Sequence, residues 1–196
     1  ARMKEPDVET VTVEVDARGV ARVTLHRAAR HNALDAAMMD ALTAAAVRLG
    51  ADPRVRVVVL AAAGASFCAG GDLEWMRSQA AADQAARRAE AARLAGMLAA
   101  LDRLPKPLIG RVQGNAFGGG VGLMAVCDSA VGVTDAAFAL TETRLGLIPA
   151  TIAPYVVARI GAPAMRRHAL AGARFGAAAA VAMGLLACAV EPDNLD

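Results

Sequence analysis

The chain has 196 residues, of which 56% are hydrophobic, and this predicts one globular domain with a sizeable core. Its net charge is only +2 and its aromatic content 3%, so it lacks the basic stripe and the stacking aromatics typical of nucleic-acid binding. The three cysteines are dispersed, as expected for reduced thiols rather than a disulfide framework. The longest uncharged runs, such as residues 175–190, are shorter than the ~20 residues that span a bilayer, and residues 1–6 lack a signal-peptide core. We therefore expect a soluble cytoplasmic protein with no nucleic-acid or membrane partner.

The N-terminal part of the chain predicts a β-hairpin followed by a helix. Residues 8–15 and Val20–Leu25 are rich in β-branched side chains in alternation, and the short polar stretch between them predicts a turn. Asn32 or Asp35 is placed to cap a helix that ends at Gly50.

The middle of the chain alternates apolar strands with helices. Residues 55–60 form a near-continuous apolar run, as expected for a strand buried on both faces, and a loop of small residues, 61–71, follows it. One or two helices are predicted over residues 75–104, which Pro105 closes, and Leu108–Val112 predicts the next strand.

The second half continues this alternation and then becomes helical. Its predicted elements are, in order, a glycine-rich loop over 114–122, a short helix over 123–126, strands over Ser129–Val133 and 137–140, and helices from Ile152 onward that are broken at 161–163 and at Gly172. Because small residues follow each strand, we expect an α/β fold whose sites lie at strand ends.

Two segments, residues 66–73 and 114–122, combine a preceding strand, several glycines and a following helix. Glycine lets a ligand approach the main chain closely, and the first N–H groups of a helix are unpaired and carry partial positive charge. The two loops therefore predict a site for an anion or a developing oxyanion. The alternative is that the glycines only permit tight packing between strand and helix.

Residues 120–125 also match the G-x-G-x-x-A form of a dinucleotide fingerprint. Asp135 or Glu142 would then have to serve as the acid that binds the ribose. This pattern keeps a nucleotide-dependent oxidoreductase open as an alternative.

Several motifs, taken in order, resemble those of the enoyl-CoA hydratase/isomerase (crotonase) family. They are Asn-Ala-Leu at 32–34, Phe-Cys-Ala-Gly-Gly-Asp-Leu at 67–73, Pro-Lys-Pro at 105–107, Gly-Asn-Ala-Phe-Gly-Gly-Gly at 114–120, Cys-Asp at 127–128, and Phe138 with Glu-Thr-Arg-Leu-Gly-Leu-Ile-Pro at 142–149. The resemblance covers essentially the whole chain.

The resemblance implies a crotonase-like α/β fold, a spiral of ββα units with a C-terminal helical part. Residues 1–196 would form a single domain, with the helical region beginning near 150–177 and truncated at the end of the sequence. Members of the family bind acyl-CoA thioesters, so coenzyme A is part of the substrate and no separate cofactor is expected. They assemble as homotrimers or as hexamers made of two trimers.

The resemblance also assigns roles to individual residues. The N–H groups of Gly71 and Gly119 would form the oxyanion hole, and Glu142 would be the catalytic acid/base. The substrate and its CoA moiety would lie against Ala69, Gly70, Asp72, Leu73, Phe117 and Gly118. Gly122 stands where family hydratases carry a first catalytic glutamate, so a two-glutamate mechanism is in doubt here.

Within the family, residues 118–123 and 141–155 resemble bacterial methylglutaconyl-CoA hydratases, which also have glycine at the first position. We therefore expect an enoyl-CoA hydratase acting on a branched or carboxylated acyl group. An enoyl-CoA isomerase, which needs only one carboxylate to shuttle a proton, is the alternative. An inactive subunit that only binds is the third interpretation.

Other chemistry-bearing side chains have structural interpretations. Asp72 is expected to cap a helix rather than act as an acid, and Arg144 to form a structural ion pair rather than grip a substrate carboxylate. Cys68 and Cys127 are expected to be buried apolar residues. No histidine shows metal-ligand spacing, so we expect no metal site.

Overall fold

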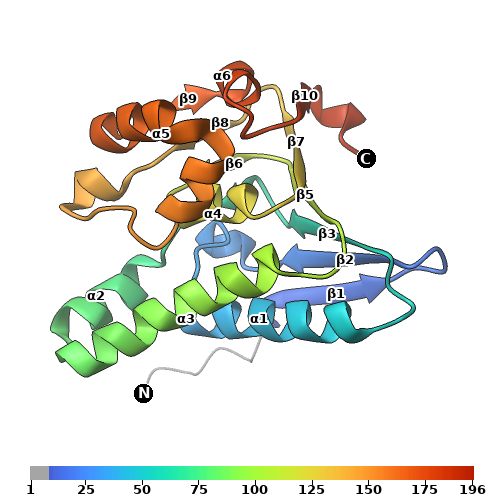
Figure 1. Ribbon diagram of the computed structural model, residues 1–196, viewed down its shortest axis with the longest axis horizontal. Coiled ribbons are helices and arrows are strands. Elements are labelled where there is room, and N and C mark those ends of the chain that lie inside the picture. The colour runs from blue at the N-terminus through green and yellow to red at the C-terminus, as the bar shows by residue number, and fades with distance from the viewer. Residues whose placement is uncertain (1–8) are drawn as a thin grey trace.

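The computed structural model describes residues 9–196, which form two β-sheets with helices packed around them (Figure 1). The larger sheet has the strand order β1-β2-β3-β5-β7-β10. Its strands are β1 (Val11–Val15), β2 (Val20–Leu25), β3 (Val57–Ala62), β5 (Leu108–Val112), β7 (Ser129–Val133) and β10 (Cys188–Val190). Only β1 runs antiparallel to its neighbour; the pairs from β2 to β10 are all parallel.

The smaller sheet has the order β4-β6-β8-β9, with β4 (Ser66–Cys68), β6 (Asn115–Phe117), β8 (Ala137–Ala139) and β9 (Phe175–Gly176). Strands β4, β6 and β8 are parallel, and β9 closes the sheet in the antiparallel direction. The carboxyl ends of β4, β6 and β8 therefore lie at one edge, where the chain leaves each strand in a loop.

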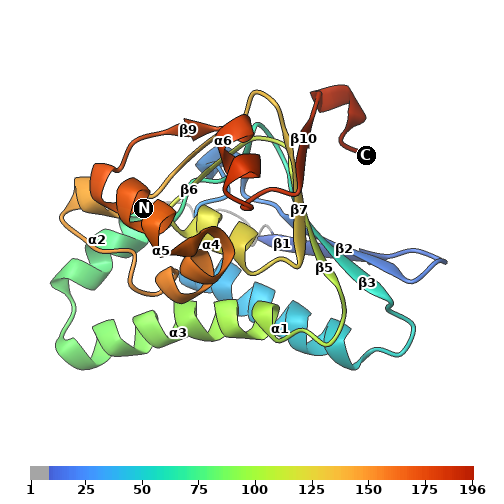
Figure 2. The ribbon, with the colours of Figure 1, turned by 45° about the horizontal axis from the view of Figure 1, so that its top comes forward.

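The helices are α1 (Ala36–Ala51), α2 (Leu73–Ala81), α3 (Gln84–Asp102), α4 (Gly119–Ala125), α5 (Ala153–Ala171) and α6 (Ala177–Ala182), with 3-10 turns η1 (Ala28–Arg30), η2 (Glu142–Leu145) and η3 (Pro192–Asn194). Helices α1 and α3 pack side by side along the lower side of the molecule in Figures 1 and 2. Their buried side chains, Met38, Met39, Leu42 and Leu49 on α1 and Met97, Leu98 and Leu101 on α3, join the main core. Each such side chain contributes about 1.5–3 kcal/mol through burial.

The chain repeats one path three times: a strand of the larger sheet, a strand of the smaller sheet, then a helical segment. The repeats are β3-β4-α2-α3, β5-β6-α4 and β7-β8-η2-α5. This is the spiral of ββα units that the sequence resemblance implied, and the expected α/β class is confirmed.

Helix α2 is tied to α3, and α3 to α1, by polar side chains. The indole Nε1 of Trp75 donates a 2.9 Å hydrogen bond to Glu90 Oε2. Arg93, one turn further along α3, pairs with Glu90 and with Asp40 on α1. These contacts fix the position of α2, which contains no buried residue of its own.

Several predicted boundaries are confirmed. Strands Val20–Leu25, Leu108–Val112 and Ser129–Val133 agree with the structure residue for residue. Asp35, rather than Asn32, caps α1, accepting a hydrogen bond from the Met38 N–H. The predicted start of the first strand at residue 8 lies outside the described residues.

Other predictions were wrong. The loops predicted at 61–71 and 114–122 contain the three-residue strands β4 and β6, and the latter loop also contains the first turn of α4. Gly50 lies inside α1, which ends one residue later, and the strand predicted from residue 55 begins at Val57. Beyond Ile152 the chain is not only helical, because it also adds β9 and β10 to the two sheets.

The long C-terminal helix breaks where it was predicted to break. Gly161 has φ +77°, a non-helical conformation that kinks α5 just before Pro163, and Gly172 ends the helix in the left-handed region. Within residues 9–196, no helix combines the length and the apolar character needed to cross a membrane.

Candidate active site

The two glycine loops meet because the strands before them are parallel neighbours. Ser66 on β4 pairs with Asn115 on β6, so the loops that follow leave the same edge side by side. Gly70 has φ +92° and lies so close to the second loop that a Cβ there would be 2.8 Å from Phe117 O and 3.5 Å from Gly119 N. Only glycine fits this approach without strain.

Each loop presents an unpaired backbone donor. In the bridge between Leu34 and Gly71, the hydrogen bonds are made by Gly70 O and by Asp72 N, which leaves the Gly71 N–H without a partner among residues 9–196. Gly119 is the first residue of α4, and its N–H also has no partner in this part of the chain. Two free donors on touching loops are suited to an oxyanion.

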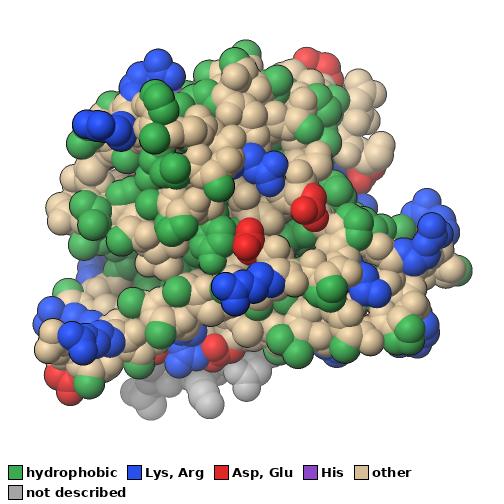
Figure 3. Space-filling model, in the orientation of Figure 1, with side chains coloured by type: hydrophobic (Ala, Val, Ile, Leu, Met, Phe, Trp, Pro, Cys, Tyr) green, Lys and Arg blue, Asp and Glu red, His purple; other side chains and the backbone are tan. Residues whose placement is uncertain are grey.

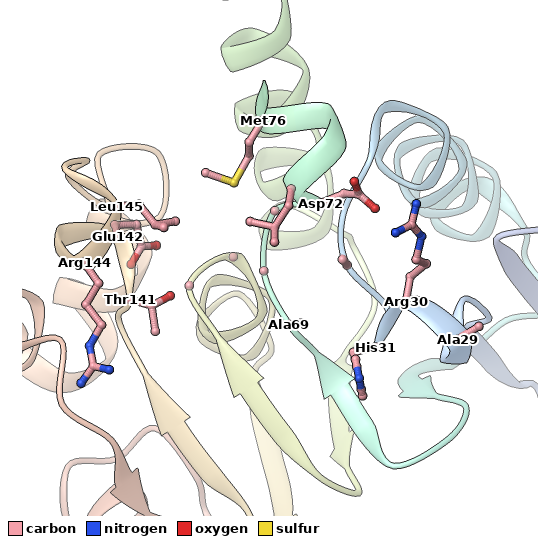
Figure 4. Close-up of a pocket in the computed structure, with 16 residues that line it drawn as sticks. Ala29, Arg30, His31, Ala69, Asp72, Met76, Thr141, Glu142, Arg144 and Leu145 are labelled. Atoms are coloured by element: carbon pink, nitrogen blue, oxygen red, sulfur yellow. The ribbon is translucent and has the colours of Figure 1, made fainter. Parts of the chain in front are cut away.

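The loops border an open cavity of about 530 Å³ and a smaller one of about 170 Å³. The larger cavity is drawn in Figure 4 and is lined by Ala29, Arg30, His31, Ala33, Ala69, Gly70, Gly71, Asp72, Leu73, Met76, Gly118, Gly119, Thr141, Glu142, Arg144 and Leu145. The smaller cavity is walled mainly by apolar side chains of α1, α2, α3 and the segment before α5. Four residues border both cavities: Gly71, Met76, Gly119 and Glu142.

Glu142 therefore lies where the two cavities join, together with both free N–H donors. It begins η2, three residues after the end of β8, and a backbone hydrogen bond from Leu147 N to Glu142 O holds the turn. Its Oε2 is buried and has no hydrogen-bond partner within the described residues. Burial raises the pKa of this carboxyl above its ordinary value. A carboxyl that is neutral more readily and has a free oxygen is suited to proton transfer.

The structure brings most of the predicted site residues together. Ala69, Gly70, Leu73 and Gly118 line the larger cavity with the two donors, and Gly118 Cα lies next to the glutamate, since a Cβ there would be 3.1 Å from Glu142 Oε1. Phe117 does not line either cavity; its ring lies under the guanidinium of Arg174, 5.1 Å from the centroid.

Asp72 borders the larger cavity but its carboxylate is already engaged. It is 5% exposed and caps α2 by accepting hydrogen bonds from the N–H groups of Glu74 and Trp75. Arg27 pairs with Asp72 at 3.2 Å and with Asp35 at 3.1 Å. The predicted capping role is confirmed, and the structure adds Arg27 as the cation that joins the caps of two helices.

Arg27, His31, Met76 and Thr141 were not singled out from the sequence, although all lie in or directly behind the site. The Asn-Ala-Leu motif was the available signal for the segment that carries His31. Both His31 and Asn32 adopt positive φ, and the fully buried Asn32 side chain donates to the carbonyls of Ala63 and Ser66. Asn32 thereby holds this segment against the end of β3 and the start of β4.

Arg144 forms no ion pair with any residue in 9–196, so the structural pair predicted for it was wrong. Its side chain instead packs against Gly172, where a Cβ would lie 3.2 Å from the Arg144 Cγ. In Figure 4 its guanidinium points away from Glu142. Cys68 and Cys127 are buried, and burial raises the pKa of each thiol to about 12, which makes them poor nucleophiles.

The dinucleotide fingerprint at 120–125 is also not supported. These residues lie inside α4 and are buried, rather than forming the loop before it. A Cβ at Gly120 would lie 2.3 Å from the Cys68 carbonyl oxygen, so this glycine serves close helix–strand packing. A pyrophosphate has no access to the backbone there.

The comparisons with known proteins agree with this geometry. Residues 16–196 match the family model described as enoyl-CoA hydratase/isomerase. The chain is 34% identical to an enoyl-CoA hydratase of Alternaria alternata over 90% of its own length and 58% of that protein's, and 34% identical to a probable enoyl-CoA hydratase of Mycobacterium bovis, covering 95% and 71%. It thus spans less than two thirds of the Alternaria relative.

Solved structures give the same result. A putative enoyl-CoA hydratase/isomerase (crotonase) from Legionella pneumophila superposes with a TM-score of 0.93 at 36% identity, covering 96% of this chain and 73% of that one. AtuE of Pseudomonas aeruginosa gives 0.91 at 40% identity, covering 95% and 72%. The chain belongs to the enoyl-CoA hydratase/isomerase family.

Proposed function

We propose that this chain carries the active site of an enoyl-CoA hydratase, which adds water to a 2-enoyl-CoA thioester without a separate cofactor. The observation that carries the proposal is one half-buried carboxylate, Glu142, beside two free N–H donors at the junction of the larger, open cavity and the smaller, apolar one. The printed names of the Alternaria and Mycobacterium relatives support the same activity.

In the proposed reaction, the thioester oxygen accepts hydrogen bonds from the Gly71 and Gly119 N–H groups. Glu142 takes a proton from a water molecule, whose oxygen bonds to C3 while the double-bond electrons move onto the thioester oxygen as an enolate. The enolate then collapses as C2 takes the proton back from Glu142. The donors stabilise the enolate more than the ground state, which for one such donor is worth about 2.7–4 kcal/mol.

A second candidate is an enoyl-CoA isomerase. It is favoured by Gly122, which leaves the site without a carboxylate at that position, because a single glutamate can remove a proton from one carbon and return it to another. In hydration the one carboxylate must both activate the water and protonate carbon. The third candidate, an inactive binding subunit, would keep the acyl-CoA site without turnover.

For the acyl group, we propose an apolar chain held in the smaller cavity. Its walls include Trp75, Leu94 and Ile152, and Glu142 is the only charged residue that borders it within the described part of the chain. The sequence likeness of residues 118–123 and 141–155 to methylglutaconyl-CoA hydratases supports a carboxylated alternative, 3-methylglutaconyl-CoA. That substrate would need a cation, and Arg144 on the larger cavity is the candidate.

We also propose that the protein self-associates, as a homotrimer or a pair of trimers. The segment before α5 exposes large apolar side chains beside the site: Leu145 is 53%, Leu147 48% and Ile148 75% exposed. Hydrophobic side chains are visible over this region of the surface in Figure 3. Exposed apolar patches of this kind are typical of protein–protein contacts.

The test is a substrate panel of crotonyl-CoA, 3-methylglutaconyl-CoA and a 3-enoyl-CoA, analysed by mass spectrometry and chromatography. Hydration adds the mass of one water, whereas isomerisation moves the double bond with no mass change. Glu142→Gln should lower turnover by at least a hundredfold while acyl-CoA still binds. The matched control is Glu14→Gln on β1, an exposed glutamate remote from both cavities. Full activity in Glu142→Gln would refute the assignment, and binding without turnover of any substrate would favour the inactive subunit.

A further inference from the structure

Gly122 faces a side chain that occupies the space that any side chain at position 122 would need. A Cβ built on Gly122 would lie 2.4 Å from Cγ2 and 3.0 Å from Cβ of Ile152. A contact of 2.4 Å does not occur between side chains that are not covalently linked, and 3.0 Å is tighter than nine in ten contacts of a real Cβ. Ile152 therefore blocks not only a glutamate at position 122 but also an alanine.

Ile152 cannot easily turn aside. It precedes α5, its carbonyl accepts the Val156 N–H at 3.0 Å, and its side chain is only 2% exposed. A β-branched side chain has few alternative rotamers, and the Cβ contact persists in all of them. Relief of the overlap would require a shift of the backbone at the start of α5.

The same side chain borders the smaller cavity. Ile152 lies among its lining residues with Gly119 and Glu142. The other side chain near a Cβ built on Gly122 is Leu98, whose Cδ2 would be 3.8 Å away. Ile152 thus separates the space over Gly122 from the apolar cavity next to the proposed acid/base.

We propose that Ile152 is a specificity-determining residue with two linked effects: it limits the length of acyl chain that the smaller cavity accepts, and it fixes position 122 as glycine. The first effect rests on the proposed function, since it concerns an acyl-CoA ligand. The second concerns packing alone and holds whatever the ligand is.

The first effect is tested by binding rather than turnover. Butyryl-, hexanoyl- and octanoyl-CoA, which are saturated and not converted, are titrated against the native chain and Ile152→Ala by calorimetry. Removing three side-chain carbons opens the cavity toward Gly122, so the preference for octanoyl over butyryl should rise at least tenfold. The matched control is Ile160→Ala, the same change at a half-buried residue that borders neither cavity and lies inside α5, the helix that Ile152 precedes.

An unchanged chain-length preference in Ile152→Ala, or an equal change in Ile160→Ala, would overturn this effect. If the native chain binds none of the three thioesters, the proposed function fails instead, and the packing test still stands.

The second effect is tested by a double-mutant cycle on stability. Gly122→Ala is introduced into the native chain and into Ile152→Ala, and each variant is unfolded in urea. In the native background the substitution should lower the equilibrium constant for folding at least tenfold; in the Ile152→Ala background it should be neutral or favourable, because alanine is the better helix former. A variant that folds only in the Ile152→Ala background supports the pairing, whereas equal effects in both backgrounds overturn it.

Discussion

Replacing Asp72 tests whether this carboxylate is a structural cap or a second acid. Asp72→Ala removes the acceptor for the Glu74 and Trp75 N–H groups, and the loss of an N-cap costs about 1 kcal/mol. It also leaves Arg27 with Asp35 as its remaining carboxylate partner. Because a hydrogen bond to a charged group is worth ~1.5–3 kcal/mol and Asp35 retains part of it, we expect a total loss of about 2 kcal/mol.

Asp72→Asn separates the two contributions. Asparagine is an equally good N-cap, so this variant should lose only the charged partner that Asp72 offers Arg27. The expected loss is about 1 kcal/mol, half the effect of the alanine variant. The assay is urea unfolding at pH 7. Equal losses in Asp72→Ala and Asp72→Asn would refute the capping argument.

The pH dependence gives an independent check. Partial burial raises the pKa of Asp72, but hydrogen bonds from Trp75 and Glu74 and the Arg27 guanidinium outweigh it, so the pKa lies below its ordinary value of 3.8. A lowered pKa contributes stability that is complete above 3.8 and is lost as the pH falls toward the folded-state pKa. The native chain should therefore lose more stability than Asp72→Asn between pH 5 and about pH 2.

Three further results are expected. Burial raises the pKa of Glu142 above its ordinary value of 4.5, so ionisation of this carboxyl opposes folding at higher pH. Glu142→Gln should therefore raise the melting temperature at pH 7, measured by calorimetry, and the gain should vanish below pH 4.5. Gly119→Pro removes one oxyanion donor at the first helical position, where proline is tolerated, and should lower kcat by about 10²–10³-fold. The control, Gly119→Ala, keeps the N–H and should lose far less activity. Equal losses in the two variants would mean that the side chain's contact with Leu34 Cδ1, 3.0 Å from the built Cβ, is responsible. Asn32→Leu leaves the carbonyls of Ala63 and Ser66 without their hydrogen-bond donor and should lower the free energy of unfolding, measured by urea denaturation, by about 2–3 kcal/mol. A loss below about 0.5 kcal/mol would contradict the structural role of Asn32.

Most strands of the larger sheet were predictable because their apolar runs are long enough to show a pattern, whereas the three-residue strand β10 was not predicted. Leu108–Val112 and Ser129–Val133 are flanked by turns and are buried in alternation, so local sequence and tertiary packing agree. In the smaller sheet only β8 was predicted, as a strand over 137–140. These strands span two or three residues and, apart from one phenylalanine each, consist of small or polar side chains. Their pairing depends on neighbours about twenty to fifty residues away, such as Ser66 with Asn115 and Ala116 with Phe138, which no local window contains.

The site follows the same division. The glycines that supply the donors were recognised because a strand, a glycine cluster and a helix follow one another in the sequence. The side chain that packs against Gly122 was not recognised, because Ile152 lies at the start of a helix thirty residues further along the chain. Arg27 was missed for a similar reason: its two carboxylate partners, Asp35 and Asp72, cap different helices.

The hydrogen bond between Trp75 and Glu90 has a practical consequence. Trp75 is the only tryptophan of the chain, it is held in one orientation on α2, and it lines the smaller cavity. Indole emission responds to the polarity of its surroundings, so an apolar group that displaces water from this cavity should shift the spectrum toward the blue. The protein thus contains its own fluorescent reporter, through which occupancy of the cavity can be followed without a label.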